Sequence, residues 1–486
     1  MIYKLRPYQE ECVKSISDYI NSDRHDPVLI VAPVAAGKSI LIAEAARLMG
    51  DKTLILQPSK ELLQQNHDKI TSYGIPATIY SASCGKKELS NMIYATLGSI
   101  KKVVGQLKEM GIRNVLIDEA HAGYSPEDGS EFMTFMNELK PRKVIGFTAT
   151  PCRLKNMSIG QTSYSQLNFI TRMRPVYFKN LIHVIQVEEM IRQGFWTPLK
   201  YETWDFNGDA LKLNSNGSEY TAESISEAVR KNGLNNLILR RLMVLKDVCR
   251  SILVFMDSVE SCNTAAEWMN AKICAGMAEV VHGGTPKKQR EAIVEGFKSG
   301  KTKVVFNYSA LGTGFDHPGL DCVIVGRPTF SFSSFYQWLG RAVRIKDGKD
   351  SALVVDCCNN SSRFGDIRKL SIENYKGYGW GMFIGDKLIT NIPMGDKVTK
   401  TDLDIKAAKK DRRRGLAQGI TASPVPGRPD HPLGSTVMTF GKYCGWMLHS
   451  IPVSYFKFIN ETFDWDNDRN KDIKEYIDFL IKNNRL

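Results

Sequence analysis

The sequence has no Cys-x-x-Cys pair, although it contains ten cysteines. Cys357 and Cys358 are adjacent, which is too cramped for a zinc knuckle. We therefore expect reduced thiols, as in a cytosolic protein, and no zinc module. The chain also lacks a signal peptide and any apolar run long enough to span a bilayer, which argues against export and against a membrane partner. Together these absences favour a cytoplasmic location.

The sequence has fewer acidic than basic residues. It contains 52 aspartates and glutamates and 65 lysines and arginines, which gives a formal net charge of +13. Such an excess favours a polyanionic partner, although it also serves solubility. The length of 486 residues suggests two or three domains, and a hydrophobic content of 43% is enough for real cores. Composition is thus compatible with a protein that binds nucleic acid, without requiring it.

Short apolar runs alternate with helical patterns in two separate parts of the chain. This alternation is typical of parallel sheets that are covered by helices on both faces, and it predicts two similar α/β domains. In such sheets the loops at the carboxyl ends of the strands gather along one edge. The predicted strands are 53–56, 92–95, 115–117 and 144–147 in the first domain, and 252–256, 280–282, 303–307, 322–326 and 352–356 in the second.

A phosphate-binding loop is predicted between the apolar run Val28–Val31 and a helical pattern that starts near Ile40. Its sequence ends in Gly37, Lys38 and Ser39, so backbone N–H groups, a lysine charge and a hydroxyl for Mg²⁺ would face the phosphates of a nucleotide. The full pattern asks for glycine at the position of Ala32. An ordinary buried turn is the alternative for this segment alone.

An acidic pair strengthens the hypothesis of a nucleotide site. Asp118 and Glu119 follow the predicted strand Asn114–Ile117 and precede Ala120 and His121. We expect Asp118 to hold Mg²⁺, directly or through water, and Glu119 to orient and deprotonate the attacking water. The alternative is a surface acidic pair beside a histidine.

The ordered motifs resemble those of superfamily 2 helicases and translocases, over about the first three quarters of the chain. Asp118 to His121 corresponds to the DEAH box, and the other motifs lie on both sides of it. They are a Q motif (Leu5–Gln9), motif Ia (Gln57–Leu62), a strand-contacting motif (Thr96–Ser99), motif III (Thr148–Pro151), motif IV (from Ile252), a possible nucleic-acid contact (His282–Thr285), motif V (Leu311–Pro318) and motif VI (Gln337–Arg344).

Within this superfamily the chain is most similar to RadD-like bacterial and phage DNA-repair helicases, judged by the Q motif and motifs V and VI. Two departures stand out. RadD-like bacterial proteins commonly carry a cysteine-rich zinc module after the motor, and this chain has none. Families with a shortened phosphate loop usually keep Thr-Gly where this chain has Val34 and Ala35.

The resemblance implies an ATP and Mg²⁺ site between two tandem RecA-like domains, with a small accessory domain after them. Arg341 and Arg344 would reach the γ-phosphate from the second domain as arginine fingers on a helix, a contribution typically worth about 10³ to 10⁵ in rate. A solvated arginine pair is the alternative. The nucleotide-binding residues implied are Arg6, Gln9, Ala35, Ala36, Gly37, Lys38, Ser39, Ile40, Gly312, Asp316 and Gln337, with Gln9 contacting adenine and with Ser39 and Asp118 as the Mg²⁺ ligands.

Nucleic acid would then lie across the motif loops of both domains. The contacts that the resemblance implies are Pro58, Ser59, Lys60, Gly98, Ser99, His282, Gly283 and Thr313. We expect DNA, single-stranded or branched, and a monomeric motor that acts in repair, recombination or replication. Protein partners cannot be inferred from the sequence.

The expected domain boundaries follow the motifs. Residues 1–151 form the first RecA-like domain, 152–249 a connector with an insertion, 250–357 the second RecA-like domain, 358–434 a basic extension and linker, and 435–486 the accessory domain. The basic run Lys400–Arg414 is either a solvated helix face or a phosphate-binding patch. In the accessory domain Lys442, Tyr443, Trp446 and Tyr455 form either a stacking surface or, as we favour, part of a small core.

The sequence therefore predicts an ATP-dependent helicase or translocase in which Lys38, Asp118, Glu119, Arg341 and Arg344 are catalytic. Three alternatives remain open. An RNA helicase shares every motif. The motor subunit of a restriction system is possible, but no nuclease carboxylate cluster is visible. A non-catalytic nucleic-acid-binding module would explain Val34 and Ala35.

Overall fold

The computed structural model describes residues 4–50, 52–159, 162–311, 315–376, 378–407, 431–462, 465, 470–483 and 486. The chain forms two compact units, Met1–Lys400 and Thr401–Leu486. Two predicted site residues, Gly312 and Thr313, lie outside the described residues, as does the part of the basic run after residue 407.

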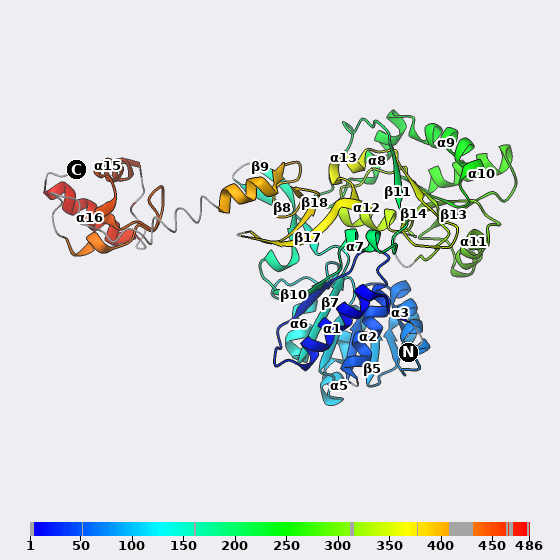
Figure 1. Ribbon diagram of the computed structural model, residues 1–486, viewed down its shortest axis with the longest axis horizontal. Helices are drawn as coiled ribbons and strands as arrows, with labels where there is room; N and C mark the ends of the chain where they lie inside the picture. Colours follow the sequence, from blue (N-terminus) through cyan, green and yellow to red (C-terminus); the bar gives the residue numbers. More distant parts are fainter. Residues whose placement is uncertain are drawn as a thin grey trace. The chain divides into compact units, whose positions relative to one another are not determined.

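An eight-stranded sheet forms the centre of the first lobe (Figure 1). All its neighbouring strands are parallel except the last pair. Its strands, in order across the sheet, are β10 (Asn180–Val184), β1 (Val28–Val31), β7 (Lys143–Thr148), β6 (Asn114–Ile117), β2 (Thr53–Leu56), β5 (Met92–Ala95), β3 (Thr78–Ser81) and β4 (Lys86–Lys87). The helices are α1 (Pro7–Asn21), α2 (Lys38–Met49), α3 (Lys60–Ser72), α4 (Leu97–Ile100), α5 (Val104–Glu109) and α6 (Glu131–Leu139).

A six-stranded, fully parallel sheet forms the second lobe. Its strands, in order, are β11 (Leu199–Thr203), β16 (Ala352–Asp356), β15 (Cys322–Val325), β12 (Ile252–Phe255), β14 (Val304–Tyr308) and β13 (Ala278–His282). The helices are α8 (Ala222–Lys231), α9 (Leu234–Val248), α10 (Val259–Lys272), α11 (Lys287–Ser299), α12 (Phe332–Leu339) and α13 (Asn360–Phe364). The predicted class of fold, two tandem RecA-like domains, is confirmed.

The central strands read as continuous apolar runs because both of their faces are buried. In β12, Ile252 and Val254 belong to one core, together with side chains of α8, α9 and α10. Leu253 and Phe255 point the other way, into a core that also contains the apolar residues of the first lobe. The apolar core is thus continuous from one lobe to the other.

The expected boundaries need correction in two places. Residues 152–249 are not a separate connector, because β10 is an edge strand of the first sheet and β11 an edge strand of the second. Apolar periodicity did not reveal β10, since none of its residues is fully buried and Asn180 and His183 interrupt its apolar residues. Residues 358–400, expected in a basic extension, instead belong to the first unit and contribute an antiparallel sheet.

That sheet and a long hairpin lie beside the two lobes. The sheet consists of β17 (Leu370–Tyr375), β18 (Gly379–Ile384), β19 (Lys387–Leu388) and β20 (Val398–Thr399). The hairpin, β8 (Cys152–Ile159) and β9 (Thr162–Phe169), starts directly after Thr150 and Pro151. Asn391 joins the hairpin to the loop before β20, because its N–H donates to the carbonyl of Leu167 (2.6 Å) and its Oδ1 accepts from the N–H of Phe169 (3.1 Å).

The second unit has its own small core around α15 (Val453–Thr462) and α16 (Lys471–Lys482). Tyr443, Trp446 and Tyr455 pack against this core, and the rings of Tyr443 and Tyr455 are 4.8 Å apart. The Nζ atom of Lys442 lies 5.5 Å from the centre of the Tyr443 ring. The three aromatic residues therefore form part of the small core, as we favoured over a stacking surface.

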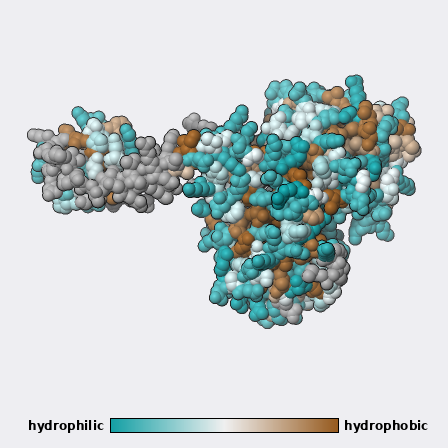
Figure 2. Space-filling view, viewed as in Figure 1, coloured by the Kyte–Doolittle hydropathy of each residue, from teal (hydrophilic) through white to brown (hydrophobic). Residues whose placement is uncertain are grey.

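The surface of the first unit is mainly hydrophilic on the face that Figure 2 shows, with apolar residues in smaller groups between the charged ones. A search of the described residues for a helix long and apolar enough to cross a lipid bilayer finds none.

Candidate functional site

The predicted phosphate loop joins β1 to α2 through residues 32–37. Gly37 is left-handed (φ 79°), and a Cβ atom there would lie 2.5 Å from Nε2 of Gln9, so only glycine fits. Ala35 is also left-handed (φ 63°), an uncommon conformation for a residue with a Cβ atom. This conformation explains why related loops usually carry glycine at the position of Ala35.

Arg6 and Gln9 lie behind this loop and do not line the cleft in front of it. Gln9 is 2% exposed; its Nε2 donates to the carbonyl of Ala36 (2.9 Å) and its Oε1 accepts from the N–H of Arg6 (3.0 Å). The Arg6 guanidinium donates to the hydroxyl of Tyr8 (3.0 Å). Both residues thus support the loop, and the contact of Gln9 with adenine stays a prediction.

Lys38 bridges the acidic pair at the end of β6. Its ammonium group is 3.0 Å from Oδ1 of Asp118 and forms a second, shorter ion pair with Glu119. Asp118 is 1% exposed, and its other oxygen accepts a hydrogen bond from Nδ2 of Asn66 (2.9 Å). Ionisable groups from two distant parts of the sequence therefore form one buried cluster.

Burial and mutual charge shift the pKa values of these three groups. Burial alone would lower the pKa of Lys38, but the charges of Asp118 and Glu119 outweigh it and raise that pKa. Burial and the neighbouring Glu119 raise the pKa of Asp118. For Glu119, Lys38 and His121 overcome burial and lower the pKa. Glu119 is therefore ionised at neutral pH and can accept a hydrogen bond from water.

His121 connects the acidic pair to the second lobe. Its Nδ1 lies 3.3 Å from Oε2 of Glu119 and 2.8 Å from the hydroxyl of Thr148. Its Nε2 lies 3.2 Å from the hydroxyl of Ser333, the second residue of α12. The same hydroxyl is 3.1 Å from that of Thr150. The DEAH box, motif III and the start of the helix that leads to motif VI thus share one polar network.

Arg341 and Arg344 come from the second lobe, but the predicted helix does not include them. α12 ends at Leu339. The chain after it does not continue as a helix, because the carbonyl of Val343 accepts a hydrogen bond from the N–H of Thr197 (2.8 Å). Both guanidinium groups donate to the carbonyl of Phe315, at 2.6 Å from Arg341 and 2.8 Å from Arg344. Burial, and for Arg341 also the charge of Arg344, lowers the pKa of both, that of Arg341 to about 9.

A cleft of about 310 Å³ brings most of the predicted residues together. Its walls come from both lobes. The predicted residues that line it are Ala35, Gly37, Lys38, Ser39, Ile40, Glu119, Asp316, Gln337, Arg341 and Arg344. Ala36 and Asp118 are buried beside it, and nothing is described for Gly312.

Several residues of this site escaped sequence reasoning. Gln65 and Lys69 line the cleft from α3, on the same helix face as Leu62, the last residue of motif Ia. Their helical spacing from Leu62 could have indicated them. Trp196 is 2% exposed, and its Nε1 donates to the carbonyl of Val34 (2.9 Å). For Trp196 and Ser333 no local pattern predicted a contact with the loop or the DEAH box.

The described members of the predicted nucleic-acid contacts lie at or just after the carboxyl ends of β2, β5 and β13. Ser59 caps α3 by accepting from the N–H of Leu62 (3.3 Å), and Ser99 accepts from the N–H of Ala82 (3.0 Å). Nδ1 of His282 accepts from the N–H of Gly284 (3.1 Å). The other described members of the set lie in the same loops or at the start of a helix, and they are Pro58, Lys60, Gly98 and Gly283.

The two RecA-like lobes and the cleft between them define a class of protein, the two-lobed P-loop motors. Comparison with protein families agrees. Residues 2–153 match the family described as type III restriction enzyme, res subunit, and residues 235–346 match the helicase conserved C-terminal domain.

Individual relatives are distant. A 51.5 kDa protein of a Lactococcus phage is 25% identical over 68% of this chain and 65% of its own length. The Saccharomyces cerevisiae protein IRC3, whose name marks it as a presumed ATP-dependent helicase, is 23% identical over 74% of this chain and 52% of its own length. A type ISP restriction-modification enzyme, LlaBIII, solved bound to DNA, has the same fold over 87% of this chain and 30% of its own (TM-score 0.53, 15% identity).

The two family matches occur in the order of a helicase core, on the two lobes that the fold requires. These matches and the fold support a helicase core like that of superfamily 2 in this chain. The chain spans about half to two thirds of the length of the two curated relatives.

Proposed function

We propose that this protein is an ATP-driven motor that translocates along DNA and hydrolyses ATP in the cleft between its two lobes. The observation that carries the proposal is the lining of that cleft. Lys38 and Glu119 reach it from the first lobe, and Arg341 and Arg344 from the second. A site made from both lobes can make closure of the lobes depend on ATP, which is how such a motor moves along a strand.

Lys38 has to exchange partners when ATP binds. Without nucleotide it neutralises Asp118 and Glu119, and the phosphates of ATP would compete for the same ammonium group. Its release leaves Glu119 with His121 as the neighbour that favours the ionised form. Glu119 is then free to orient the attacking water and accept its proton.

The acidic pair also suits Mg²⁺, which prefers oxygen ligands and is usually held by one or two carboxylates and by substrate phosphates. The ammonium group between Asp118 and Glu119 marks a place where a cation is stabilised. Asp118 and the hydroxyl of Ser39 would hold the ion. When bound, Mg²⁺ would neutralise charge on the phosphates during transfer.

The arginines of the second lobe would complete the site. Both guanidinium groups donate to the carbonyl of Phe315, and that of Arg344 also forms an ion pair with Asp316 (3.0 Å). A phosphate offers a charged acceptor and would attract them more strongly than the carbonyl does. Their movement toward the γ-phosphate would draw the lobes together.

We further propose a RadD-like role in DNA repair, recombination or replication, for a monomeric enzyme. The support is the resemblance of the Q motif Leu5–Gln9 and of motifs V and VI to that group, together with the net charge of +13. A second candidate is the motor of a restriction system, which the match of residues 2–153 to a res subunit favours.

The test is the rate of ATP hydrolysis with single-stranded DNA, duplex DNA, branched DNA and RNA in parallel, for the native chain, Lys38→Ala and Glu119→Gln. We expect DNA to stimulate the native enzyme most, and either substitution to abolish the stimulated rate while the circular dichroism spectrum is retained. Lys108→Ala and Glu138→Gln are matched controls, because both residues are exposed and lie on α5 and α6, outside the cleft.

Each contrary result has a defined meaning. Undiminished turnover in Lys38→Ala or Glu119→Gln would overturn the site. Stronger stimulation by RNA would replace DNA as the substrate, and no stimulation by any nucleic acid would favour a non-catalytic binding module. DNA cleavage by a complex of this chain with a nuclease subunit would favour the restriction motor.

A further inference from the structure

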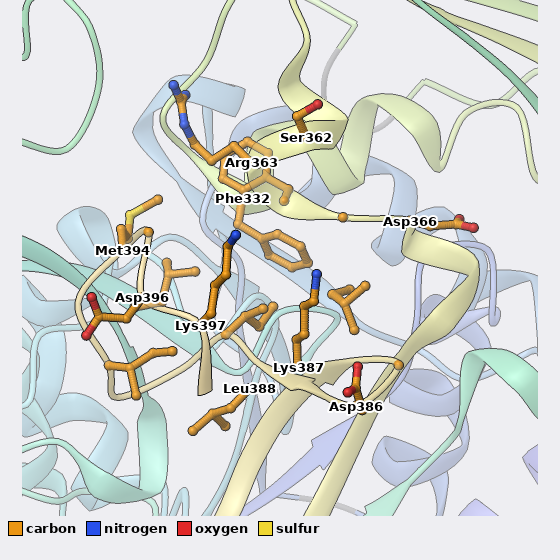
Figure 3. A pocket seen from close by; sticks show the side chains of 18 of the residues that line it. Phe332, Ser362, Arg363, Asp366, Asp386, Lys387, Leu388, Met394, Asp396 and Lys397 are labelled. Atoms are coloured by element: carbon orange, nitrogen blue, oxygen red, sulfur yellow. The ribbon is translucent and has the colours of Figure 1, made fainter. Parts of the chain in front are cut away.

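A second cavity, of about 460 Å³, lies outside the ATP cleft (Figure 3). Its walls come from the start of α12, from the segment 362–369 that begins in the last residues of α13, and from the segment 384–397 that includes β19. Its volume falls within the range of about 300 to 1,000 Å³ that is typical of ligand pockets. None of the helicase motifs accounts for it, apart from the helix that leads into motif VI.

Lysines without an acidic partner give this cavity its charge. Lys369, Lys387 and Lys397 line it and are exposed, and none has an ion pair among the described residues. In Figure 3, Lys387 and Lys397 extend in the same direction, toward the ring of Phe332. Lysines that converge without a carboxylate partner repel one another, and an anion between them would relieve that repulsion.

The acidic residues of the cavity do not cancel this charge. Asp366 is already paired with Arg368, whose guanidinium lies 2.7 Å from its carboxylate. In Figure 3 the carboxylates of Asp386 and Asp396 lie apart from the ammonium groups of Lys387 and Lys397. The three lysines thus face two uncommitted carboxylates, because the guanidinium of Arg363 donates to the carbonyl of Thr329 (2.9 Å) and points away from them in Figure 3. The cavity therefore favours an anionic ligand.

The floor of the cavity narrows the choice of anion. Phe332, Phe364 and Leu388 line it but are only 1%, 3% and 2% exposed. No flat aromatic face of these residues is therefore open for a base to stack on, whereas exposed lysines reach the rim. Such a site can bind phosphate groups but offers no surface for a base. Proteins use contacts of this kind to bind a nucleic-acid backbone independently of its sequence.

The wall of the cavity is also the start of the helix that leads to the ATP cleft. Phe332 is the first residue of α12; its ring stacks on that of Tyr336 (5.8 Å between centres) and meets that of Phe364 edge-on (5.8 Å). The next residue, Ser333, lies within 3.2 Å of His121 and Thr150. A ligand that shifts Phe332 would therefore also shift Ser333 against the DEAH box and motif III.

We propose that this cavity binds the phosphodiester backbone of a nucleic-acid strand through Lys369, Lys387 and Lys397, and that α12 transmits its occupancy to the ATP cleft. The inference rests on the proposed function, because the cavity would give the motor a further contact with the nucleic-acid strand along which it moves. It adds a contact that lies outside the motif loops.

The first test compares Lys387→Gln/Lys397→Gln with Lys14→Gln/Lys108→Gln, a control that removes the same charge from exposed lysines of α1 and α5. Fluorescence anisotropy measures the affinity for a labelled oligothymidylate of about 20 nucleotides over a range of salt concentrations. Removal of one lysine–phosphate contact reduces the slope of log affinity against log salt by about 0.7, so we expect a slope smaller by about 1.4. An increase of about fourfold in salt would then cost the variant about sevenfold less affinity than the native chain.

Lys387→Arg/Lys397→Arg, which keeps both charges, should retain the native slope. The concentration of oligothymidylate that half-activates ATP hydrolysis should rise in the Gln variant and not in the control. A Gln variant that matches the control in both slope and activation would overturn the inference. That result, with ATP hydrolysis still stimulated by DNA in a Lys38-dependent way, would leave the proposed function intact; loss of all stimulation in the native chain would remove both.

The second test identifies the source of the phosphate. Lysine acetylation followed by mass spectrometry reports the accessibility of Lys369, Lys387 and Lys397, with Lys14 as the internal reference. Protection by the oligothymidylate, but not by thymidine monophosphate or inorganic phosphate at equal phosphate concentration, supports the strand. Protection by the monophosphate or by free phosphate to the same degree would overturn it in favour of a small-molecule site, and protection by none would reject the cavity as a phosphate site.

Discussion

The hydroxyl of Ser333 lies 3.2 Å from Nε2 of His121, so one side chain of the second lobe contacts the DEAH box of the first. The same hydroxyl is 3.1 Å from Thr150, in motif III. His121 in turn lies against Glu119. The residue that we expect to activate water is therefore two contacts away from the helix that leads to the arginines of motif VI.

Replacement of Ser333 by alanine should weaken the coupling between nucleic acid and ATP hydrolysis. The change removes a hydrogen-bonding group from both His121 and Thr150, and each such bond is worth about 1 kcal/mol. We expect the concentration of single-stranded DNA that half-activates hydrolysis to rise roughly fivefold to thirtyfold, which corresponds to about 1 to 2 kcal/mol. Steady-state ATP hydrolysis against DNA concentration measures it.

Ser334→Ala is the matched control, because the hydroxyl of Ser334 bonds locally, to that of Ser331 (3.0 Å). Its activation curve should coincide with that of the native chain. Equal behaviour of Ser333→Ala and Ser334→Ala would show that the contact between the lobes carries no coupling.

A second contact between the lobes joins Gly340 to Val34. A Cβ atom on Gly340 would lie 2.7 Å from the Cβ and Cγ2 atoms of Val34, closer than real side chains approach. The phosphate loop and motif VI can therefore meet only because residue 340 is glycine. Val34 is branched at Cβ, and its Cγ1 atom would also lie within 3.0 Å, so the loop leaves no room for a side chain at residue 340.

Gly340→Ala should push the phosphate loop away from motif VI and slow ATP hydrolysis by at least about tenfold, because a displacement of about 1 Å at a catalytic site can cost about 10²-fold. Val34→Gly should restore part of the rate in the double variant, since substitutions at residues in contact are not additive. The rate of DNA-stimulated hydrolysis measures both effects.

Gly105→Ala is the control for the glycine change, since nothing lies within 4 Å of a Cβ atom there. Its rate should equal that of the native chain. Strictly additive effects of Val34→Gly and Gly340→Ala would contradict the contact.

Much of the first lobe could be predicted because its signals are local. Val28–Val31, Thr53–Leu56 and Met92–Ala95 are apolar or buried throughout, and each became a strand of the first sheet. Gly37, Lys38 and Ser39 identified the phosphate loop because the chemistry of the loop depends on consecutive residues. Short-range patterns of this kind need no knowledge of the tertiary structure.

Other features depend on contacts between residues far apart in sequence. Ser333 meets Thr150 and His121, which lie 183 and 212 positions earlier, and a lone serine gives no sign of this. Arg341 and Arg344 lie outside the predicted helix because Thr197 donates hydrogen bonds to the carbonyls of residues 343 and 344. The cavity with Lys387 and Lys397 exists only because the small sheet packs near α12. None of these contacts follows from periodicity.

His317 should make the stability of the second lobe depend on pH. Its side chain is buried, packs 5.0 Å from the ring of Phe297, and its Nε2 lies 2.8 Å from the hydroxyl of Ser251. Burial, followed by the charges of three lysines, lowers its pKa from 6.5 to about 4. Those lysines are Lys346, Lys298 and Lys349.

Between about pH 4 and 6.5 the unfolded chain therefore binds a proton at this histidine that the folded chain does not. The free energy of unfolding should fall as the pH is lowered through this window, by at most about 1.4 kcal/mol per pH unit from this group. His317→Gln, which keeps a partner for Ser251, should fall less steeply, so the two curves should converge toward pH 4. Urea unfolding of both proteins at intervals between about pH 4 and 7 measures the difference, with His25→Gln as the control because His25 is exposed. Parallel curves for the native chain and His317→Gln would show that this histidine titrates alike in the folded and unfolded states.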